Sequence, residues 1–140
     1  MLTPEEAASR LRRLIEERYS GCVLFATLFG SVAKGRAGPL SDVDVAVKLA
    51  SGCEHLEFLV SFSADASEVL GIDDVDVLIL TDDLPYELRY RAASGRLIYA
   101  RDREIYVEYM VTSFSLWADF QIHLAKTKAR ERFAESLWVK

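Results

Sequence analysis

Cysteine and histidine are scarce in this 140-residue sequence, which contains two of each. Two cysteines cannot build the disulfide framework of a small secreted domain, so we expect Cys22 and Cys53 to be buried and reduced. His55 and His123 lie far apart and share no zinc-ligand spacing with the cysteines. This spacing argues against a structural zinc site.

Long apolar runs and an excess of basic residues are also missing. No stretch reaches the ~20 apolar residues of a membrane helix, and the N-terminus has no basic-then-apolar signal pattern. We therefore expect a cytoplasmic protein without membrane contact. The formal net charge of −5 argues against direct nucleic-acid binding, which depends on Lys and Arg neutralising phosphates. One local basic turn would still suffice for a small phosphorylated ligand.

The remaining composition is that of a globular protein, with 51% hydrophobic and 28% charged residues. We expect one domain over residues 1–140, because a chain of this length can bury a hydrophobic core. Apolar periodicity and capping residues predict alternating elements: a helix from Thr3, strands at 22–29 and 41–47, a helix at 54–70, a strand at 74–80, a short helix at 83–95, a strand at 97–100, and a C-terminal helical region from Asp102 with an interruption near 112–115. This order predicts an α/β fold, a small mixed β-sheet flanked by helices.

Gly30-Ser31 stands where the first predicted strand ends and a short helix is expected to begin. Backbone N–H groups at such a start, together with a serine hydroxyl, suit an anion such as phosphate. Lys34 and Arg36 follow closely enough to face the same phosphates. The spacing Gly30-x4-Gly35 matches a P-loop, but Arg36 stands where a P-loop carries lysine, so we reject that motif.

Asp42 and Asp44 lie two residues apart on a predicted strand, which places both carboxylates on one face. Two like charges held so close repel each other, and Mg²⁺ would remove the repulsion. Asp76, flanked by valines in a later strand, would be costly to bury unless it joined the same cluster. Three carboxylates beside a phosphate site indicate two-metal phosphoryl or nucleotidyl transfer. Asp74 would share a face with Asp76 and is the second choice for the third carboxylate.

Each half of this pattern also has an ordinary explanation. A Gly-Ser pair before polar residues is often just a turn, and Asp-x-Asp on a strand is often a solvated edge. The two halves combined form a spacing that resembles a family. Gly30-Ser31, ten residues and then Asp42-Val43-Asp44 is similar to the signature of the DNA polymerase β-like nucleotidyltransferase superfamily. Ser41, VDVL (75–78) and LRYRAASGRLIYARD (88–102) are similar to its minimal nucleotidyltransferase (MNT) branch.

This resemblance implies the nucleotidyltransferase fold and assigns roles to the motif residues. It implies that Gly30 and Ser31 hold the triphosphate of ATP, with Lys34, Arg36 and Ser41 completing the nucleotide site. Lys34 departs from the arginine that is common at that position. Asp42 and Asp44 would bind two Mg²⁺ ions. Asp76 would join these metal ligands and help to activate the attacking hydroxyl as general base.

The acceptor of the nucleotide is the next question. Related enzymes that act on antibiotics or RNA carry a second domain for the acceptor, and 140 residues leave no room for one. The minimal branch is typically paired with a HEPN-domain toxin. The resemblance therefore implies a hetero-oligomer in which this chain is a type VII-like antitoxin that transfers AMP to a tyrosine of the toxin. Transfer to a small hydroxylated molecule such as an aminoglycoside, and a non-catalytic antitoxin that neutralises by binding, both stay open.

The C-terminal region is rich in apolar side chains that cover more of a helix surface than one core-facing stripe requires. Aromatic residues and methionine are enriched at the centres of interfaces, which favours a partner-binding surface. A helix that only covers the sheet explains the same pattern equally well. The residues concerned are Tyr106, Tyr109, Met110, Phe114, Leu116, Trp117, Phe120, Ile122 and Leu124.

Overall fold

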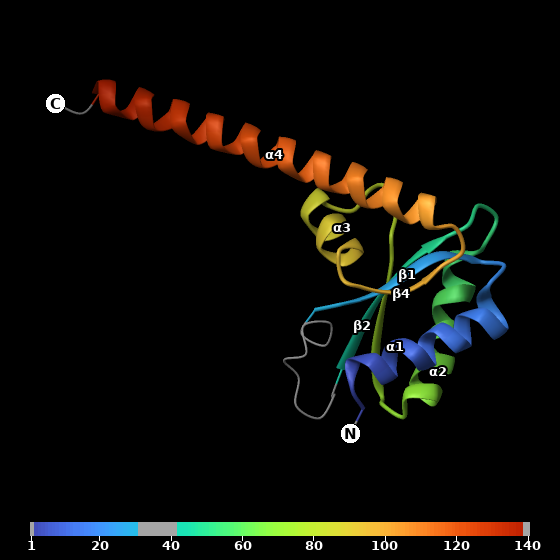
Figure 1. The fold of residues 1–140 in the computed structure, drawn as a ribbon. Helices are drawn as coiled ribbons and strands as arrows, with labels where there is room; N and C mark the ends of the chain where they lie inside the picture. Colours follow the sequence, from blue (N-terminus) through green and yellow to red (C-terminus); the bar gives the residue numbers. More distant parts are fainter. Residues whose placement is uncertain (1, 31–41, 139–140) are drawn as a thin grey trace.

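The structure, a computed structural model, describes residues 2–30 and 42–138; residues 1, 31–41 and 139–140 and the side chains of Asp42 and Trp138 lie outside that description. A four-stranded sheet in the order β3-β2-β1-β4 forms its centre, with helices on both faces (Figure 1). Strand β1 (Val23–Phe29) is antiparallel to β2 (Asp42–Leu49) and to β4 (Arg96–Ala100). Strand β2 is parallel to β3 (Asp74–Ile79). The expected α/β fold with a small mixed sheet is confirmed.

One face of the sheet is covered by two helices. Helix α1 (Pro4–Leu14) begins at Thr3, whose hydroxyl accepts a hydrogen bond from the Glu6 backbone N–H at 3.1 Å, as its sequence predicts. A π-helical segment, η1 (Ile15–Tyr19), continues it. Helix α2 (His55–Leu70) follows β2 and ends at a glycine with positive φ. Alternate residues of β2 are fully buried against these helices: Val43, Val45 and Val47.

The other face carries helix α3 (Tyr86–Ala93) and helix α4 (Arg103–Trp138) (Figure 1). Phe25 of β1 packs its ring on Tyr106 and Tyr109 of α4, with centroids 5.2 and 5.3 Å apart. The buried Thr27 hydroxyl donates to the Ala92 carbonyl oxygen at 2.7 Å and so ties α3 to the sheet. These contacts fix α3 and the first half of α4 over the face that carries the even-numbered residues of β2.

Helix α4 is longer and more regular than the sequence predicts. The expected interruption near residues 112–115 is wrong, because the helix runs unbroken for 36 residues. Ser113 is only 3% exposed, since α4 packs against α3 in this region. That packing outweighs the weak helix propensity of the hydroxyl residues. Beyond α3, the helix extends away from the sheet (Figure 1).

The prediction of two reduced cysteines is also wrong. Cys22 and Cys53 form a disulfide, with Cα atoms 5.7 Å apart. The cause is the antiparallel register of β1 and β2, which pairs Val23 with Leu49 and continues as a 2.7 Å hydrogen bond from Ala50 N–H to the Cys22 carbonyl. This register brings the start of β1 beside the loop that leads into α2. Both cysteines are only partly buried.

Candidate active site

The two carboxylates at the centre of the site are neighbours across the parallel pair β2–β3. The register pairs Asp44 with Asp76, and Asp42 with Asp74. Asp44 shares its face of β2 with Ala46, which is buried beneath α3 and α4. The carboxylate row therefore lies on the side of the sheet that α3 and α4 cover.

Asp76 lies in the expected strand, but the expectation that its carboxylate is buried is wrong. We expected a buried carboxylate, whereas Asp76 and Asp74 are both exposed. Strand β3 is the edge of the sheet, so an aspartate there keeps its contact with water. Asp76 is directly opposite Asp44 and Asp74 is one row away. Asp76 thus stays the first choice as third carboxylate.

Gly30, at the end of β1, lies directly against Asp44. Its φ of +79° is in the left-handed region that favours glycine. A Cβ atom at this position would stand 2.7 Å from Asp44 Oδ2. The carboxylate of Asp44 therefore reaches Gly30, and these two residues bring one member of each half of the motif together in space.

The rest of the predicted nucleotide site cannot be placed in the same way. Ser31, Lys34, Arg36 and Ser41 lie outside the described residues. Asp42 begins β2, where its backbone pairs with that of Asp74. The roles that the sequence assigns to these five positions stay predictions.

The chemistry of the donors fits Mg²⁺. Carboxylate oxygens are hard ligands, and Mg²⁺ is commonly bound by one or two carboxylates together with substrate phosphates. Asp44 and Asp76, directly opposite on neighbouring strands, are a like-charge pair that a cation would stabilise. Within the described side chains, no group of three or more His, Cys, Asp or Glu residues is close enough to hold a metal ion. Asp42, whose side chain is outside that set, is the ligand that the motif would add.

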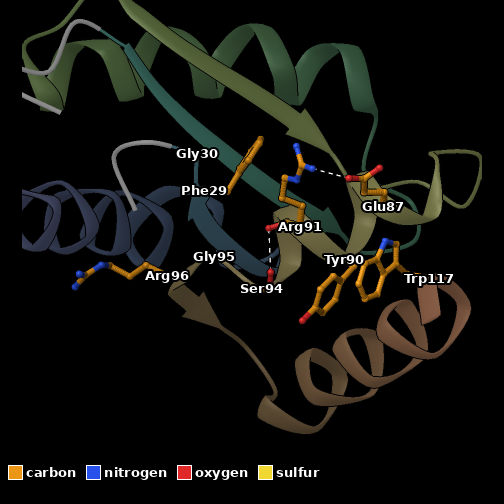
Figure 2. Close-up of a pocket in the computed structure, with 9 residues that line it drawn as sticks. All are labelled: Phe29, Gly30, Glu87, Tyr90, Arg91, Ser94, Gly95, Arg96 and Trp117. Carbon is orange, nitrogen blue, oxygen red and sulfur yellow. Dashed lines mark hydrogen bonds and ion pairs between the residues drawn. The ribbon is translucent and has the colours of Figure 1, made fainter. Parts of the chain in front are cut away.

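A cavity that the sequence did not predict adjoins Gly30. It has a volume of about 580 Å³ (Figure 2). It is lined by Phe29 of β1 and the following Gly30, by α3 residues including Tyr90 and Arg91, by Gly95 and Arg96, and by Trp117 of α4. The register pairs Phe29 directly with Asp44. In the sequence, residues 88–102 contribute only to the resemblance to the minimal nucleotidyltransferase branch. That resemblance does not indicate that α3 and α4 would enclose a space beside Asp44.

The fold and this site together define a nucleotidyltransferase of the polymerase β-like kind. Residues 13–104 match the family model described as "Polymerase beta, Nucleotidyltransferase", and the chain belongs to that family. A search of curated protein sequences finds no match.

Solved structures with the same fold include several toxin–antitoxin complexes. One is a toxin–antitoxin complex with AMP-PNP, with a TM-score of 0.66, 17% identity, and coverage of 86% of this chain and 94% of the other. A second is the MntA–HepT complex, with a TM-score of 0.62, 15% identity, and coverage of 90% and 97%. A third is a tri-AMPylated HEPN toxin of Shewanella oneidensis in complex with an MNT antitoxin, with a TM-score of 0.64, 15% identity, and coverage of 91% and 98%. At these identities the likeness shows the fold.

Proposed function

We propose that this protein is an Mg²⁺-dependent adenylyltransferase of the minimal nucleotidyltransferase branch. It transfers AMP from ATP to a tyrosine hydroxyl of a HEPN-domain toxin and thereby acts as the antitoxin. The observation that carries the proposal is the contact between Gly30 and Asp44, because it joins the expected phosphate-binding turn to the carboxylates. The names of the similar complexes, with an ATP analogue in one and an AMPylated HEPN toxin in another, support it.

The residues of this chain divide the work as follows. The backbone N–H groups at Gly30-Ser31 bind and orient the triphosphate. Asp42, Asp44 and Asp76 would hold the Mg²⁺ ions, and two bound ions would neutralise the charge that develops on the phosphates. Asp76 takes the proton of the acceptor hydroxyl. The acceptor oxygen bonds to the α-phosphorus, the bond from that phosphorus to the bridging oxygen breaks, and pyrophosphate leaves with the electron pair.

Exposure of Asp76 suits this role. A general base must come within hydrogen-bond reach of the acceptor, and the acceptor here is a side chain of another protein. Asp76 lies on the edge strand and is open to solvent. The tyrosine of a partner can therefore approach from the β3 side without any movement of the sheet.

The exposed apolar side chains of α4 supply a surface for that partner. Tyr106 and Tyr109 belong to the core under the first half of the helix. Phe120, Ile122 and Phe133 are 44%, 54% and 67% exposed, and large exposed apolar groups are typical of interfaces. We assign these side chains to the contact with the HEPN-domain toxin in a hetero-oligomer.

We also propose one domain over residues 1–140 and a cytoplasmic location with the toxin. Within residues 2–30 and 42–138, no helix has the length and apolar character that a membrane span requires. A reducing cytoplasm disfavours the Cys22–Cys53 disulfide of the structure, and melts with and without a reductant measure how much the fold depends on it. Catalysis in this account uses neither cysteine.

Labelled ATP distinguishes the proposed acceptor from the alternatives. The protein is incubated with Mg²⁺, α-labelled ATP and the product of the neighbouring gene, and in parallel with a panel of aminoglycosides. Label on a tyrosine of the protein partner supports the proposal. Label on an aminoglycoside alone would overturn the acceptor. Protection of cells by Asp44→Asn at the wild-type level would show that neutralisation requires only binding.

A further inference from the structure

We propose that the acceptor protein binds to the outer edge of β3 as an added β-strand, with its tyrosine in register with Asp76. The inference rests on the proposed function and states how the acceptor is held, which the motif residues leave open. Three observations carry it: outward backbone groups along β3, a row of residues that leads from this edge to Asp44, and the negative charge of the strand.

The outer edge of β3 presents backbone groups that nothing in the described part of the chain satisfies. Directly after β3, the Leu80 N–H donates to the Val47 carbonyl oxygen at 2.8 Å, which fixes the phase of the parallel pair. Even-numbered residues of β3 therefore turn their N–H and C=O groups towards β2, and those of Val75, Val77 and Ile79 are directed outward. Within residues 2–30 and 42–138, no hydrogen bond reaches these outward groups. An edge of this kind is a template for a further strand.

A strand added at this edge places a tyrosine beside the proposed general base. Residues directly opposite on neighbouring strands share a face, and their Cβ atoms lie about 4.5–5.5 Å apart. The register already gives the row Asp76–Asp44–Phe29, so a tyrosine opposite Asp76 extends this row by one strand. In an antiparallel addition, Asp76 takes a position between hydrogen-bonded pairs, where opposite side chains approach most closely. The phenol then lies across Asp76 in the direction of Asp44.

The two faces of β3 define a pattern for the acceptor segment. A shift of one residue moves every side chain of a strand to the opposite face, so only every second residue of the added strand reaches the Asp76 side. On the other face, Val75, Val77 and Ile79 are half-buried and pack against the core beneath α2. Apolar residues directly before and after the tyrosine would extend that core. The expected segment therefore alternates.

The charge of the edge completes the pattern. Residues 74–83 contain four aspartates and no lysine or arginine, and all four aspartates are exposed: Asp74, Asp76, Asp82 and Asp83. Such a charge disfavours pairing of the edge with a second copy of itself, because like charges opposite each other repel. A basic segment is attracted instead. We therefore expect lysine or arginine two residues from the tyrosine, on the face of Asp74 and Asp76.

Synthetic peptides test this pattern, with transfer of AMP from α-labelled ATP and Mg²⁺ as the readout. The strand peptide is Arg-Val-Arg-Val-Tyr-Val-Arg-Val-Arg. The proline peptide replaces both valines beside the tyrosine by proline, which keeps the charge and removes the two N–H groups that would pair with β3. N-acetyltyrosinamide is the minimal acceptor, because it brings the same phenol without a strand.

Three variants of the protein address the edge itself. Ile79→Pro removes an outward N–H three residues from Asp76, and proline is tolerated on an edge strand where the N–H faces solvent. Ile79→Val is the matched control, since valine is close to proline in size and keeps the N–H. Asp82→Lys reverses one charge outside the site. Circular dichroism melts check that each variant is folded, and the two peptides with Asp82→Lys keep the test decisive if Ile79→Pro does not fold.

We expect the KM of the strand peptide to be roughly tenfold or more below that of the proline peptide, for two hydrogen bonds. Ile79→Pro should raise the KM of the strand peptide about threefold to tenfold, and Ile79→Val should change it less than about twofold. Asp82→Lys should raise it about threefold, an effect that salt weakens. No variant should change transfer to N-acetyltyrosinamide. Equal KM values for the two peptides, or equal effects of proline and valine at residue 79, would overturn the inference.

Further outcomes separate this inference from the proposed function. If a HEPN-domain protein is labelled equally well by wild type and Ile79→Pro, the inference is wrong while the proposed function stands. If the peptides behave as expected but no HEPN-domain protein is modified, the inference stands and the proposed acceptor is wrong. Self-association of the wild type in light scattering that Ile79→Pro abolishes would assign the edge to a second copy and overturn the inference. A wild type that labels no tyrosine in any acceptor contradicts both.

Discussion

Gly30, at the end of β1, leaves no room for a side chain between its backbone and the carboxylate of Asp44 on β2. Any side chain at residue 30 would meet this carboxylate, since a Cβ there would stand 2.7 Å from Oδ2. The positive φ of Gly30 adds a second reason for glycine. One residue therefore ends the strand, begins the expected phosphate turn and leaves space for Asp44.

Replacing Gly30 by alanine should damage the site more than the fold. A non-glycine residue at this φ costs about 1–3 kcal/mol of stability, and the added Cβ displaces the Asp44 carboxylate. Misplacement of a reacting group by about 1 Å costs roughly a hundredfold in rate, so AMP transfer should fall by about that factor. Gly21→Ala is the control, because no atom lies within 4 Å of a Cβ built there. Wild-type transfer rates in Gly30→Ala would contradict the account.

Thr27→Val should destabilise the protein through the loss of one buried hydrogen bond. The Thr27 hydroxyl, fully buried, donates to the Ala92 carbonyl oxygen at 2.7 Å, and valine leaves that oxygen without its donor. We expect the free energy of unfolding to fall by about 1–3 kcal/mol in urea titrations. Thr112→Val, on the exposed side of α4, should change it by less than about 0.5 kcal/mol. Equal effects of the two substitutions would count against this role of Thr27.

Reduction of the disulfide should lower stability without abolishing activity. The bond joins residues 31 positions apart, and closing a loop of that length restricts the unfolded chain by roughly 3–4 kcal/mol. Thermal melts with and without a reductant should differ accordingly in the wild type. The double variant Cys22→Ser with Cys53→Ser should melt identically in both conditions. A wild type that is insensitive to reductant would argue against a disulfide in solution.

Stability should fall in alkaline solution because two tyrosines of the core resist ionisation. Burial raises the pKa of Tyr106 and of Tyr109 above the usual value of 10.0. Their contribution to stability is complete below the unfolded-state pKa and is lost as the pH rises through the higher folded-state pKa. The unfolding free energy should therefore decrease from about pH 10 upward. Tyr106→Phe with Tyr109→Phe should decrease less steeply over that range, and parallel curves would contradict the assignment.

Most of the secondary structure could be predicted because it depends on local patterns. The Thr3 cap, the glycine after α2 and the alternation along β2 each act within a few residues, and the structure contains all three. The pairing of Cys22 with Cys53 depends instead on the register of two strands. Composition alone carries no information about that register, so the expectation of reduced thiols was wrong.

The candidate site likewise has features that local sequence patterns predict and features that depend on the tertiary structure. The residue types at Gly30, Asp44 and Asp76 could be read from the sequence, whereas the approach of Gly30 to Asp44 depends on the register that pairs Phe29 with Asp44. The exposure of Asp76 follows from the edge position of β3, which depends on strand order. The cavity is assembled from β1, α3, the turn before β4 and α4, and Tyr90 and Trp117 meet only because the unbroken α4 lies across α3. No local pattern contains those contacts.

The most direct test of the account is AMP transfer by single carboxylate variants. Wild type, Asp44→Asn, Asp76→Asn and, as control, Asp73→Asn from the loop before β3 are compared with labelled ATP, Mg²⁺ and the HEPN-domain partner, after melts show equal folding. We predict a fall of about a hundredfold or more for Asp44→Asn, a fall of about 10²–10⁴-fold for Asp76→Asn, and wild-type transfer for Asp73→Asn. Wild-type labelling of the partner by Asp44→Asn would contradict the central claim.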